Sequence, residues 1–528
     1  MSHAKTRPSA NDRRQFLRYT WRGVQTSLSL ALLQGTDLLA APKLGANPFT
    51  LGVASGDPTP DGIVLWTRLA PDPANPASLG NAAIPVSWRV AADGRMQQVI
   101  VSGVAMASAD LAHSVHVEVQ GLLPRRDYFY QFNMGGEESA IGHFRTAPAI
   151  DELLSELRFA FVTCQDWPSA FYTVYRDMLQ NDLDVVFHLG DYTYEYAIHS
   201  TNRGVSVPGV FHKACEDLRT YRLRHTLYKT DPDLQAAHQK FPFVVIWDDH
   251  EVANDYSGLA PEFGSPSPAF TAKRAAAYQA YYEHMPIRLS VALNPRAGLR
   301  IYRRLRYGPL AEFTMLDDRQ YRSDNPCGDG ESLRCEAART GNYTMLGLEQ
   351  EQWVREGFAR SSSQWNIVAQ QLLIAQLEHT TIQPDWFWND AWDGYPLARQ
   401  RLLSDVVNTQ LTNPVFLTGD WHSTFVNDLK ANFDDPASAT IATEFVTPAI
   451  TSGGDGTPYG PYYAPMIPDN PHIKYYEGDR RGYFKATVTP ERMTLHLRFV
   501  TSVENANGIG YAEGSWVVED GVPGAVPT

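Results

Sequence analysis

The sequence predicts an N-terminal β-sandwich followed by a larger α/β domain of two stacked mixed sheets flanked by helices. Short alternating strand patterns, separated by Gly, Pro, Asp and Asn, fill residues 49–146. From residue 157 onward, continuous apolar runs alternate with helical patterns, and strand patterns return near the C-terminus to supply a second sheet. A chain of 528 residues also favours two or three domains over one.

The first 41 residues have the features of an export signal. Arg13 and Arg14 precede a short apolar stretch and a small-residue segment. A bilayer span takes about 20 apolar residues, which this stretch does not reach. We therefore expect a twin-arginine signal peptide, recognition by the twin-arginine translocase, a periplasmic or extracellular protein and no transmembrane segment in the mature chain. An amphipathic N-terminal helix is the alternative.

Residues 45–148 are predicted to form the sandwich. Strand patterns at 63–66 and 86–90 lead to a Leu-Pro turn, a Tyr-rich run at 128–130 and a Thr-Ala-Pro exit at 146–148. This order is typical of fibronectin type III and immunoglobulin-like domains of about one hundred residues. A linker then leads to the larger domain, which we place at residues 155–515.

The larger domain is predicted to alternate strands with helices. Its strands read as continuous apolar runs, which indicates burial on both faces of a sheet. The expected strands are 157–163, 184–189, 243–247, 312–316, 365–369 and 415–418, and the expected helices are 170–180, 270–284, 348–358 and 397–408.

Four polar motifs are the most informative feature, and most of them directly follow apolar runs. They end in Cys164 or occupy residues 190–195, 248–255 and 419–422. Carboxylates, imidazole, phenol and thiol at strand ends are ligands that a multi-metal site needs. Each motif alone has a plainer explanation: an inert buried Cys, a strand-end turn, a solvated charged loop, or a capping Asp beside a core His. The occurrence of all four motifs in one chain, most of them at strand ends, favours metal binding over these separate explanations.

Asp191 is the strongest single candidate. It follows an apolar strand and a glycine, and its two carboxylate oxygens can bridge cations about 3.5–4 Å apart. Tyr194, three residues further on, can return its phenol to the same cation. Asp420 and His422 are two residues apart, so in an extended segment their side chains point the same way.

The segment 248–255 offers several possible ligands. Asp249 is a carboxylate candidate, and the amide oxygen of Asn254 is a reasonable ligand for a hard cation. His250 can instead face the reacting group as an acid or a transition-state stabiliser. Asp393, in an aromatic loop, is a weaker candidate for an additional cation, because an ordinary salt-bridged loop explains it equally well.

Composition narrows the class of ligand. The net charge of −14 argues against a nucleic-acid partner, which would select a basic face. An acidic protein can still bind phosphate esters when metals supply the positive charge. The segment 317–322 can supply an arginine that clamps phosphate oxygens. Cys327 and Cys335 flank a Gly-rich loop where a local disulfide is plausible, and Cys215 is a candidate free thiol.

Taken together, these motifs resemble the PhoD-type alkaline phosphatases and phosphodiesterases from about residue 49 almost to the C-terminus. The resemblance implies a metallophosphatase-like core and a site with one Fe³⁺ and one or two Ca²⁺. The segments that carry it are 49–58, 64–69, 161–164, 190–195, 247–251, 317–322 and 419–422.

The resemblance also implies roles for individual residues. Iron ligands would be Cys164, Asp191, Tyr194 and His422. Calcium ligands would be Asp191, Asp249 or Asn254, and Asp420, with Asp393 as a further candidate. A metal-activated hydroxide would attack phosphorus in a phosphate mono- or diester, with Asp191 and His250 as catalytic residues. The alternatives are a phospholipase D-like diesterase on the same core and a cell-surface binding protein with structural metals. We expect a monomer.

Overall fold

The computed structural model describes residues 46–528 except 76–77, 289–292, 295–297, 436 and 457–458. The export signal predicted for residues 1–41 lies outside the described residues. Among the helices of the described part, none combines the length and the apolar character needed to cross a membrane.

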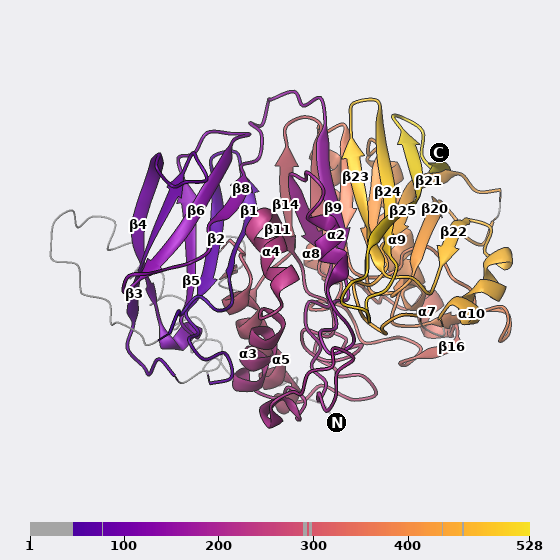
Figure 1. Ribbon diagram of the computed structural model, residues 1–528. Helices are drawn as coiled ribbons and strands as arrows, with labels where there is room; N and C mark the ends of the chain where they lie inside the picture. The colour runs from indigo at the N-terminus through magenta and orange to yellow at the C-terminus, as the bar shows by residue number, and fades with distance from the viewer. Residues whose placement is uncertain (1–45, 76–77, 289–292, 295–297, 436, 457–458) are drawn as a thin grey trace.

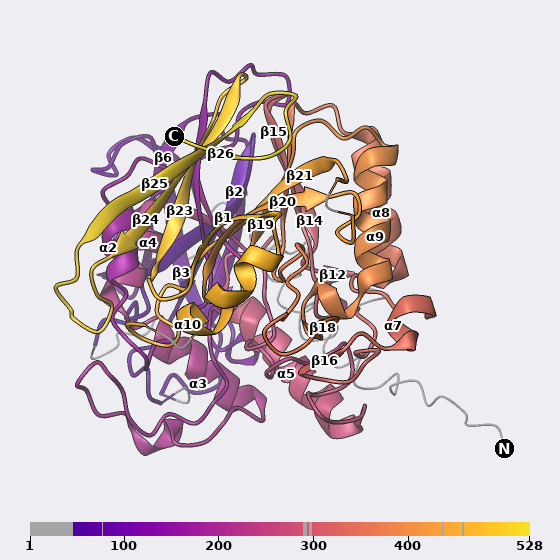
Figure 2. The same cartoon turned by 90° about the vertical axis from the view of Figure 1, so that its right-hand side faces the viewer.

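Two large mixed sheets stack face to face and carry helices on their outer faces (Figures 1 and 2). In the described part of the chain, the first sheet has ten strands in the order β26-β25-β24-β23-β9-β10-β11-β1-β2-β5. Their bounds are β1 Val53–Thr59, β2 Gly62–Arg68, β5 Ser114–Gln120, β9 Leu157–Val162, β10 Val185–His188, β11 Pro242–Val245, β23 Gly482–Val488, β24 Arg492–Val500, β25 Gly510–Glu519 and β26 Val526–Pro527.

The second large sheet, within the same described ranges, has seven strands in the order β14-β15-β17-β19-β21-β20-β22. Strands β15, β17, β19 and β21 run parallel to one another, as do β9, β10 and β11 in the first sheet. The bounds are β14 Arg303–Tyr307, β15 Ala311–Met315, β17 Trp365–Ala369, β19 Pro414–Thr418, β20 Thr424–Lys430, β21 Thr440–Val446 and β22 Ile473–Glu477.

A third sheet packs on the N-terminal end of the first. It pairs β4-β3-β6-β7, with β8 also on β6, and its apolar side chains meet those of β1, β2 and β5 in one buried cluster. Its strands are β3 Ile84–Ala91, β4 Val99–Ala107, β6 Asp127–Met134, β7 Glu137–Glu138 and β8 Gly142–Arg145. Two small two-stranded sheets pair β12 (Leu293–Asn294) with β13 (Gly298–Leu299) and β16 (Glu331–Leu333) with β18 (Trp386–Trp388).

The N-terminal sandwich is continuous with the core. Strand β1 pairs in parallel with β11, with Ser55 opposite Pro242, so the first sheet runs across the boundary expected near residue 148. The two sheets of the N-terminal region are therefore not a free-standing module, because one of them is the end of the ten-stranded sheet.

Helices cover both outer faces. α2 and α4 lie against the first sheet, and α8 and α9 lie against the second, giving four layers (Figure 2). The helices are α2 Thr173–Met178, α3 Leu218–Tyr228, α4 Pro232–Lys240, α5 Pro268–His284, α7 Glu336–Thr340, α8 Gly347–Arg360, α9 Pro396–Asn408 and α10 Tyr459–Tyr463, with 3₁₀ turns η2 Ala109–Leu111, η3 Gly209–Phe211, η4 Trp392–Gly394 and η5 Ala464–Asp469.

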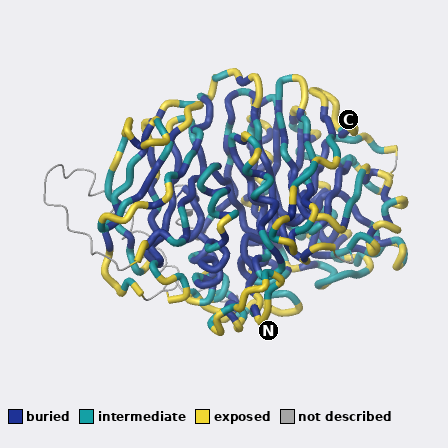
Figure 3. The backbone as a smooth tube through the Cα atoms, viewed as in Figure 1, coloured by how far each residue is buried: buried dark blue, intermediate teal, exposed yellow. Residues whose placement is uncertain are grey.

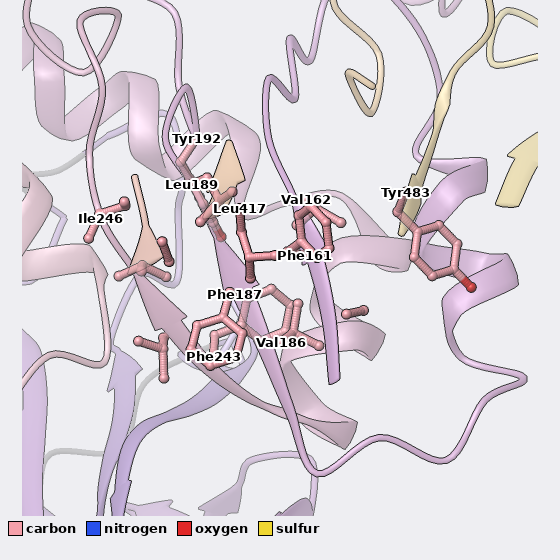
Figure 4. Close-up of a cluster of buried hydrophobic side chains, with 14 of the residues drawn as sticks. Phe161, Val162, Val186, Phe187, Leu189, Tyr192, Phe243, Ile246, Leu417 and Tyr483 are labelled. Carbon is pink, nitrogen blue, oxygen red and sulfur yellow. The ribbon is translucent and has the colours of Figure 1, made fainter. Parts of the chain in front are cut away.

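Aromatic side chains join the two large sheets. Phe187 of β10 stacks on Phe313 of β15, with 4.3 Å between ring centroids. Phe161, Phe243 and Leu417 gather in the same layer (Figure 4). The central strands are buried along their length (Figure 3), as their continuous apolar runs predict. This packing fixes the strand ends against one another.

The predicted strands of the larger domain agree with the observed ones to within two residues. The helix expected at 170–180 is shorter, at Thr173–Met178. Helices α3 and α4 were not anticipated, although both carry start signals. Asp217 and Thr220 form a capping box at α3, and Asp231 caps α4 ahead of Pro232.

Candidate metal centre

The four predicted strand-end motifs meet at the edge where the parallel strands end. Cys164, Asp191, Asp420 and His422 all have left-handed backbone conformations, with φ between 54° and 60°. Such conformations cost about 1–3 kcal/mol each in non-glycine residues and persist only where surrounding structure imposes them. Gly190, with φ of 113°, precedes Asp191, and a Cβ there would lie 2.4 Å from the Cβ of Asp248.

Glu251 holds two of these strand ends together. Its buried carboxylate accepts the backbone N–H groups of Asp191 at 3.1 Å, Tyr192 at 2.6 Å and Asp248 at 2.8 Å. The turns after β10 and β11 therefore share one acceptor. Because three backbone N–H groups from two turns meet on its side chain, Glu251 contributes to the imposed geometry of Asp191.

Potential metal ligands form a contiguous centre. Within the described residues, three groups have ligand atoms that all lie within 4.8 Å of one another. The first and second groups share Asp191, and the second and third share Asp249. The groups are Cys164–Asp191–His422, Asp191–Asp249–His250 and Asp248–Asp249–Asp420.

Tyr194 belongs to the first group through its phenol. Its hydroxyl donates to Asp191 Oδ2 at 2.7 Å, lies 3.1 Å from His422 Nε2 and accepts from Ser452 Oγ at 2.7 Å. Burial, and after it the charge of Asp191, raises the pKa of both Tyr194 and Cys164 well above the usual values. Anionic phenolate and thiolate therefore need a cation beside them.

His250 is oriented by Glu195. Its Nδ1 lies 2.9 Å from Glu195 Oε2, and Nε2 on the other side of the ring lies 3.8 Å from Asp249 Oδ2. Burial opposes the charged imidazole, but Asp249, Asp191 and Glu195 outweigh it and raise the pKa of His250 well above its usual value. With Nδ1 held by Glu195, Nε2 is the ring nitrogen that faces the acidic cluster.

Arg319 occupies the other side of the acidic groups. Its fully buried guanidinium donates to Asp248, to Asp390 at 2.6 Å, to Asp249 at 3.2 Å and to Asp420 at 3.3 Å. Arg319 therefore has no free donor face for a phosphate, contrary to the possibility raised for segment 317–322. Arg322 is likewise buried against Asp390.

Two sequence candidates, Asn254 and Asp393, have hydrogen-bond partners of their own. Asn254 accepts from the Tyr196 hydroxyl at 3.0 Å and donates to Glu262 at 2.8 Å. Asp393 accepts from Arg399 at 2.6 Å and from the Leu377 backbone at 2.8 Å. Asp393 therefore forms the ordinary ion pair that was its alternative explanation.

Sequence reasoning missed several members of the site. Glu195 and Ser452 orient His250 and Tyr194, and Asp390 balances Arg319. Asp390 lies three residues before Asp393 in the same aromatic segment, so this acid was a usable sequence signal. The disulfide expected between Cys327 and Cys335 is present, with Cα atoms 5.5 Å apart, and Cys215 is a buried free thiol.

The residues fit a multi-metal group. Among the described residues, Asp191 Oδ1 and Asp248 Oδ2 are buried without a hydrogen-bond partner. Buried carboxylate oxygens are normally paired or metal-bound. Thiol, phenol and imidazole donors suit a transition metal, whereas the carboxylate group around Asp249 suits a hard cation.

Two stacked mixed sheets with shared carboxylates, imidazoles and a thiol at one strand edge define a hydrolase of the metal-dependent phosphoesterase class. The chain belongs to the PhoD-like phosphatase family: the family model matches residues 159–497, and the model of the PhoD-like phosphatase N-terminal domain matches residues 36–148. The protein is therefore a phosphoester hydrolase, and the alternative of a binding protein with structural metals is set aside.

Two known proteins are similar over nearly the whole chain. Alkaline phosphatase D of Bacillus subtilis (strain 168) is 42% identical over 499 residues, which cover 93% of this chain and 85% of that protein. A solved structure described as the structure of PhoD is 41% identical, with a TM-score of 0.87, covering 92% of this chain and 93% of that one.

Proposed function

We propose that this protein is an exported alkaline phosphatase/phosphodiesterase that holds one Fe³⁺ and one or two Ca²⁺ at the described centre. The observation that carries the proposal is the sharing of Asp191 between two ligand groups. A carboxylate common to two adjacent groups is the arrangement that a two-metal hydrolase requires.

The ligand chemistry supports different cations at the two sides. Cys164, Tyr194, Asp191 and His422 would hold iron, since anionic sulfur and phenolate oxygen favour a trivalent ion. Asp191, Asp249 and Asp420 would hold calcium, which prefers several oxygen ligands. Asn254 and Asp393 do not enter this assignment, because their side chains are engaged elsewhere.

The bound cations would lower the pKa of the attacking water and supply positive charge for the phosphoryl oxygens. The water gives up one proton to the solvent, and its oxygen forms a bond to phosphorus while the bond from phosphorus to the ester oxygen breaks. His250 Nε2 gives its proton to the departing alkoxide, and Glu195 keeps the ring oriented through Nδ1. Asp191, which belongs to both ligand groups, would set the distance between the iron ligands and the calcium ligands.

The proposal includes export and a monomeric state. Arg13 and Arg14 within the basic N-terminal segment support passage through the twin-arginine translocase to the periplasm or the exterior. Replacing both arginines by lysine in the natural host tests this: the phosphatase should then remain inside the cell. A phospholipase D-like diesterase on the same core is the rival activity, and hydrolysis of phosphatidylcholine in preference to simple esters would favour it.

Asp191→Asn tests the central claim, with Asp182→Asn as the matched control, since Asp182 pairs with Arg158 on the surface. We expect Asp191→Asn to lose metal by elemental analysis and about 10³-fold in turnover of p-nitrophenyl esters, corresponding to about 4 kcal/mol of lost transition-state stabilisation. Retained metal and activity would contradict the bridging role. Zinc or manganese in place of iron would keep the hydrolase and overturn the thiolate–phenolate iron assignment.

A further inference from the structure

Aromatic rings continue outward from both sides of the metal centre. On one side Tyr196 lies against His250, with 5.2 Å between ring centroids, and on the other Tyr459 lies 6.0 Å from His422. Tyr194 joins the two histidines, since its ring is 4.2 Å from His250 and its hydroxyl contacts His422. A row of rings therefore crosses the site and ends in a tyrosine at each flank.

The flank beside His250 is extended by exposed apolar surface. Tyr196 is 49% exposed and Phe263 is 76% exposed. They are linked through Asn254, which contacts the Tyr196 hydroxyl and the neighbour of Phe263, Glu262. Phe263 has φ of 50° and its backbone N–H donates to Asp329 at 2.6 Å. A phenylalanine is seldom this exposed and seldom adopts a left-handed backbone conformation. Here the carboxylate of Asp329 holds its backbone in place.

The flank beside His422 is similar. Tyr459 and Tyr462 lie one turn apart on α10, and Tyr462 is 38% exposed. The Tyr462 hydroxyl donates to Glu331 at 2.8 Å, in the loop segment that the Cys327–Cys335 disulfide braces. That segment also contains Asp329, which accepts from the Phe263 backbone, so one braced segment contacts one aromatic residue of each flank.

Negative charge accompanies these rings. Glu262, Asp329 and Glu331 are all partly exposed. The Glu262 carboxylate accepts from the side chain of Asn254 at 2.8 Å, four residues after His250, so it lies at the rim of the centre. Carboxylates on the rim repel a dianionic phosphate monoester more strongly than a monoanionic diester, because the Coulomb energy scales with the charge of the ligand.

We propose that the two aromatic flanks, Tyr196 with Phe263 and Tyr459 with Tyr462, bind the organic groups on either side of the reacting phosphorus. The preferred substrate is then a phosphodiester with at least one ring-bearing or apolar ester group. This rests on the proposed function, since it names the substrate class of the same site. A monoester would occupy one flank only and would meet the acidic rim as a dianion.

The test compares two diesters that share one leaving group. Methyl p-nitrophenyl phosphate and phenyl p-nitrophenyl phosphate both release p-nitrophenolate, so the retained ester group is the main difference between them. We expect the metal-loaded wild-type enzyme to show a kcat/KM about 5- to 10-fold higher for the phenyl diester, the value of one aromatic contact. Tyr196→Ala and Phe263→Ala should reduce this ratio towards one.

Controls separate ring stacking from folding. Tyr196→Phe keeps the ring and should keep the ratio, and so should Leu153→Ala, which truncates an apolar side chain that is 83% exposed outside the rim. Glu262→Gln should raise kcat/KM for p-nitrophenyl phosphate relative to the diesters.

The outcomes are distinguishable. Hydrolysis of both diesters with a wild-type ratio near one, or with a ratio unchanged in Tyr196→Ala and Phe263→Ala, would overturn the aromatic recognition and leave the hydrolase intact. Failure of the metal-loaded enzyme to hydrolyse any of the three esters would overturn the proposed function and this inference with it.

Discussion

Lys229 provides a quantitative test of the buried core behind the metal centre. It follows α3, its ammonium lies 4.4 Å from the Trp66 ring centroid, and it donates to the Tyr192 hydroxyl at 3.1 Å. Tyr192 in turn contacts His238 at 2.7 Å, and His188 and His225 also lie close to Tyr192. Within the described part of the chain, no carboxylate forms an ion pair with Lys229, and burial lowers its pKa from 10.5 to about 7.

This shift makes the stability of the fold depend on pH. The folded pKa lies below the unfolded one, so between about pH 7 and pH 10.5 the unfolded chain binds more protons at Lys229, and stability rises with pH across that window. Below it, Lys229 is charged in both states, and burying that charge costs about 5 kcal/mol. The cost falls to about 2 kcal/mol at pH 9 and vanishes above the unfolded pKa.

Lys229→Met keeps the side-chain length and removes the charge. We expect the variant to be more stable than the wild type at pH 7, with a gain that shrinks by several kcal/mol as the pH rises to 10. Urea unfolding at pH 7, 8, 9 and 10 measures this, with Lys474→Met as the control because Lys474 is half exposed beside Asp428. A gain that stays constant with pH, or a variant less stable at pH 7, would refute the reasoning.

Three further changes probe the centre itself. Arg319→Met leaves buried carboxylates without their guanidinium partner and should lower the free energy of unfolding by about 4 kcal/mol, and an unchanged melting temperature would count against this. Glu251→Gln replaces one acceptor oxygen of three backbone bonds by a donor and should weaken metal retention during dialysis against a chelator, whereas retention equal to wild type would remove its positioning role. Cys164→Ser should abolish or shift the visible thiolate-to-iron absorption of the loaded protein, and a spectrum identical to the wild type would exclude Cys164 as an iron ligand.

Much of the centre was predictable because its residues directly follow buried strands. Parallel strands end at one edge of a sheet, so Cys164 and Asp191 had to be neighbours once their apolar runs were recognised. Asp420 follows β19 of the opposing sheet, and the stacking of the two sheets brings it to the same place. The chemistry of the side chains then indicated metal binding without any knowledge of distances.

Other features of the structure leave no local signal in the sequence. Asn254 and Asp393 lie in turns, where the backbone path decides which way a side chain points, and both meet partners that no sequence spacing reveals. The pairing of β1 with β11 joins residues 55 and 242, so a sheet that crosses the expected domain boundary leaves no local signal. Local periodicity predicts elements well, whereas contacts between segments distant in sequence depend on packing.

The excess of acidic groups in the centre indicates that bound metal would stabilise the folded protein. Burial raises the pKa of Asp248 and Asp420 well above the usual value, although Arg319 opposes this, because the acidic groups of the centre also repel one another. Arg319 donates to four other carboxylates of the centre. The Oδ1 atom of Asp191 is left buried without a hydrogen-bond partner. Cations bound next to Asp191 would supply the positive charge that the acidic groups need. Because a ligand that binds only the folded state stabilises that state, metal binding would also stabilise the fold. A protein that folds before it is exported would then carry its metals with it, since the site is assembled from segments that meet only in the folded chain.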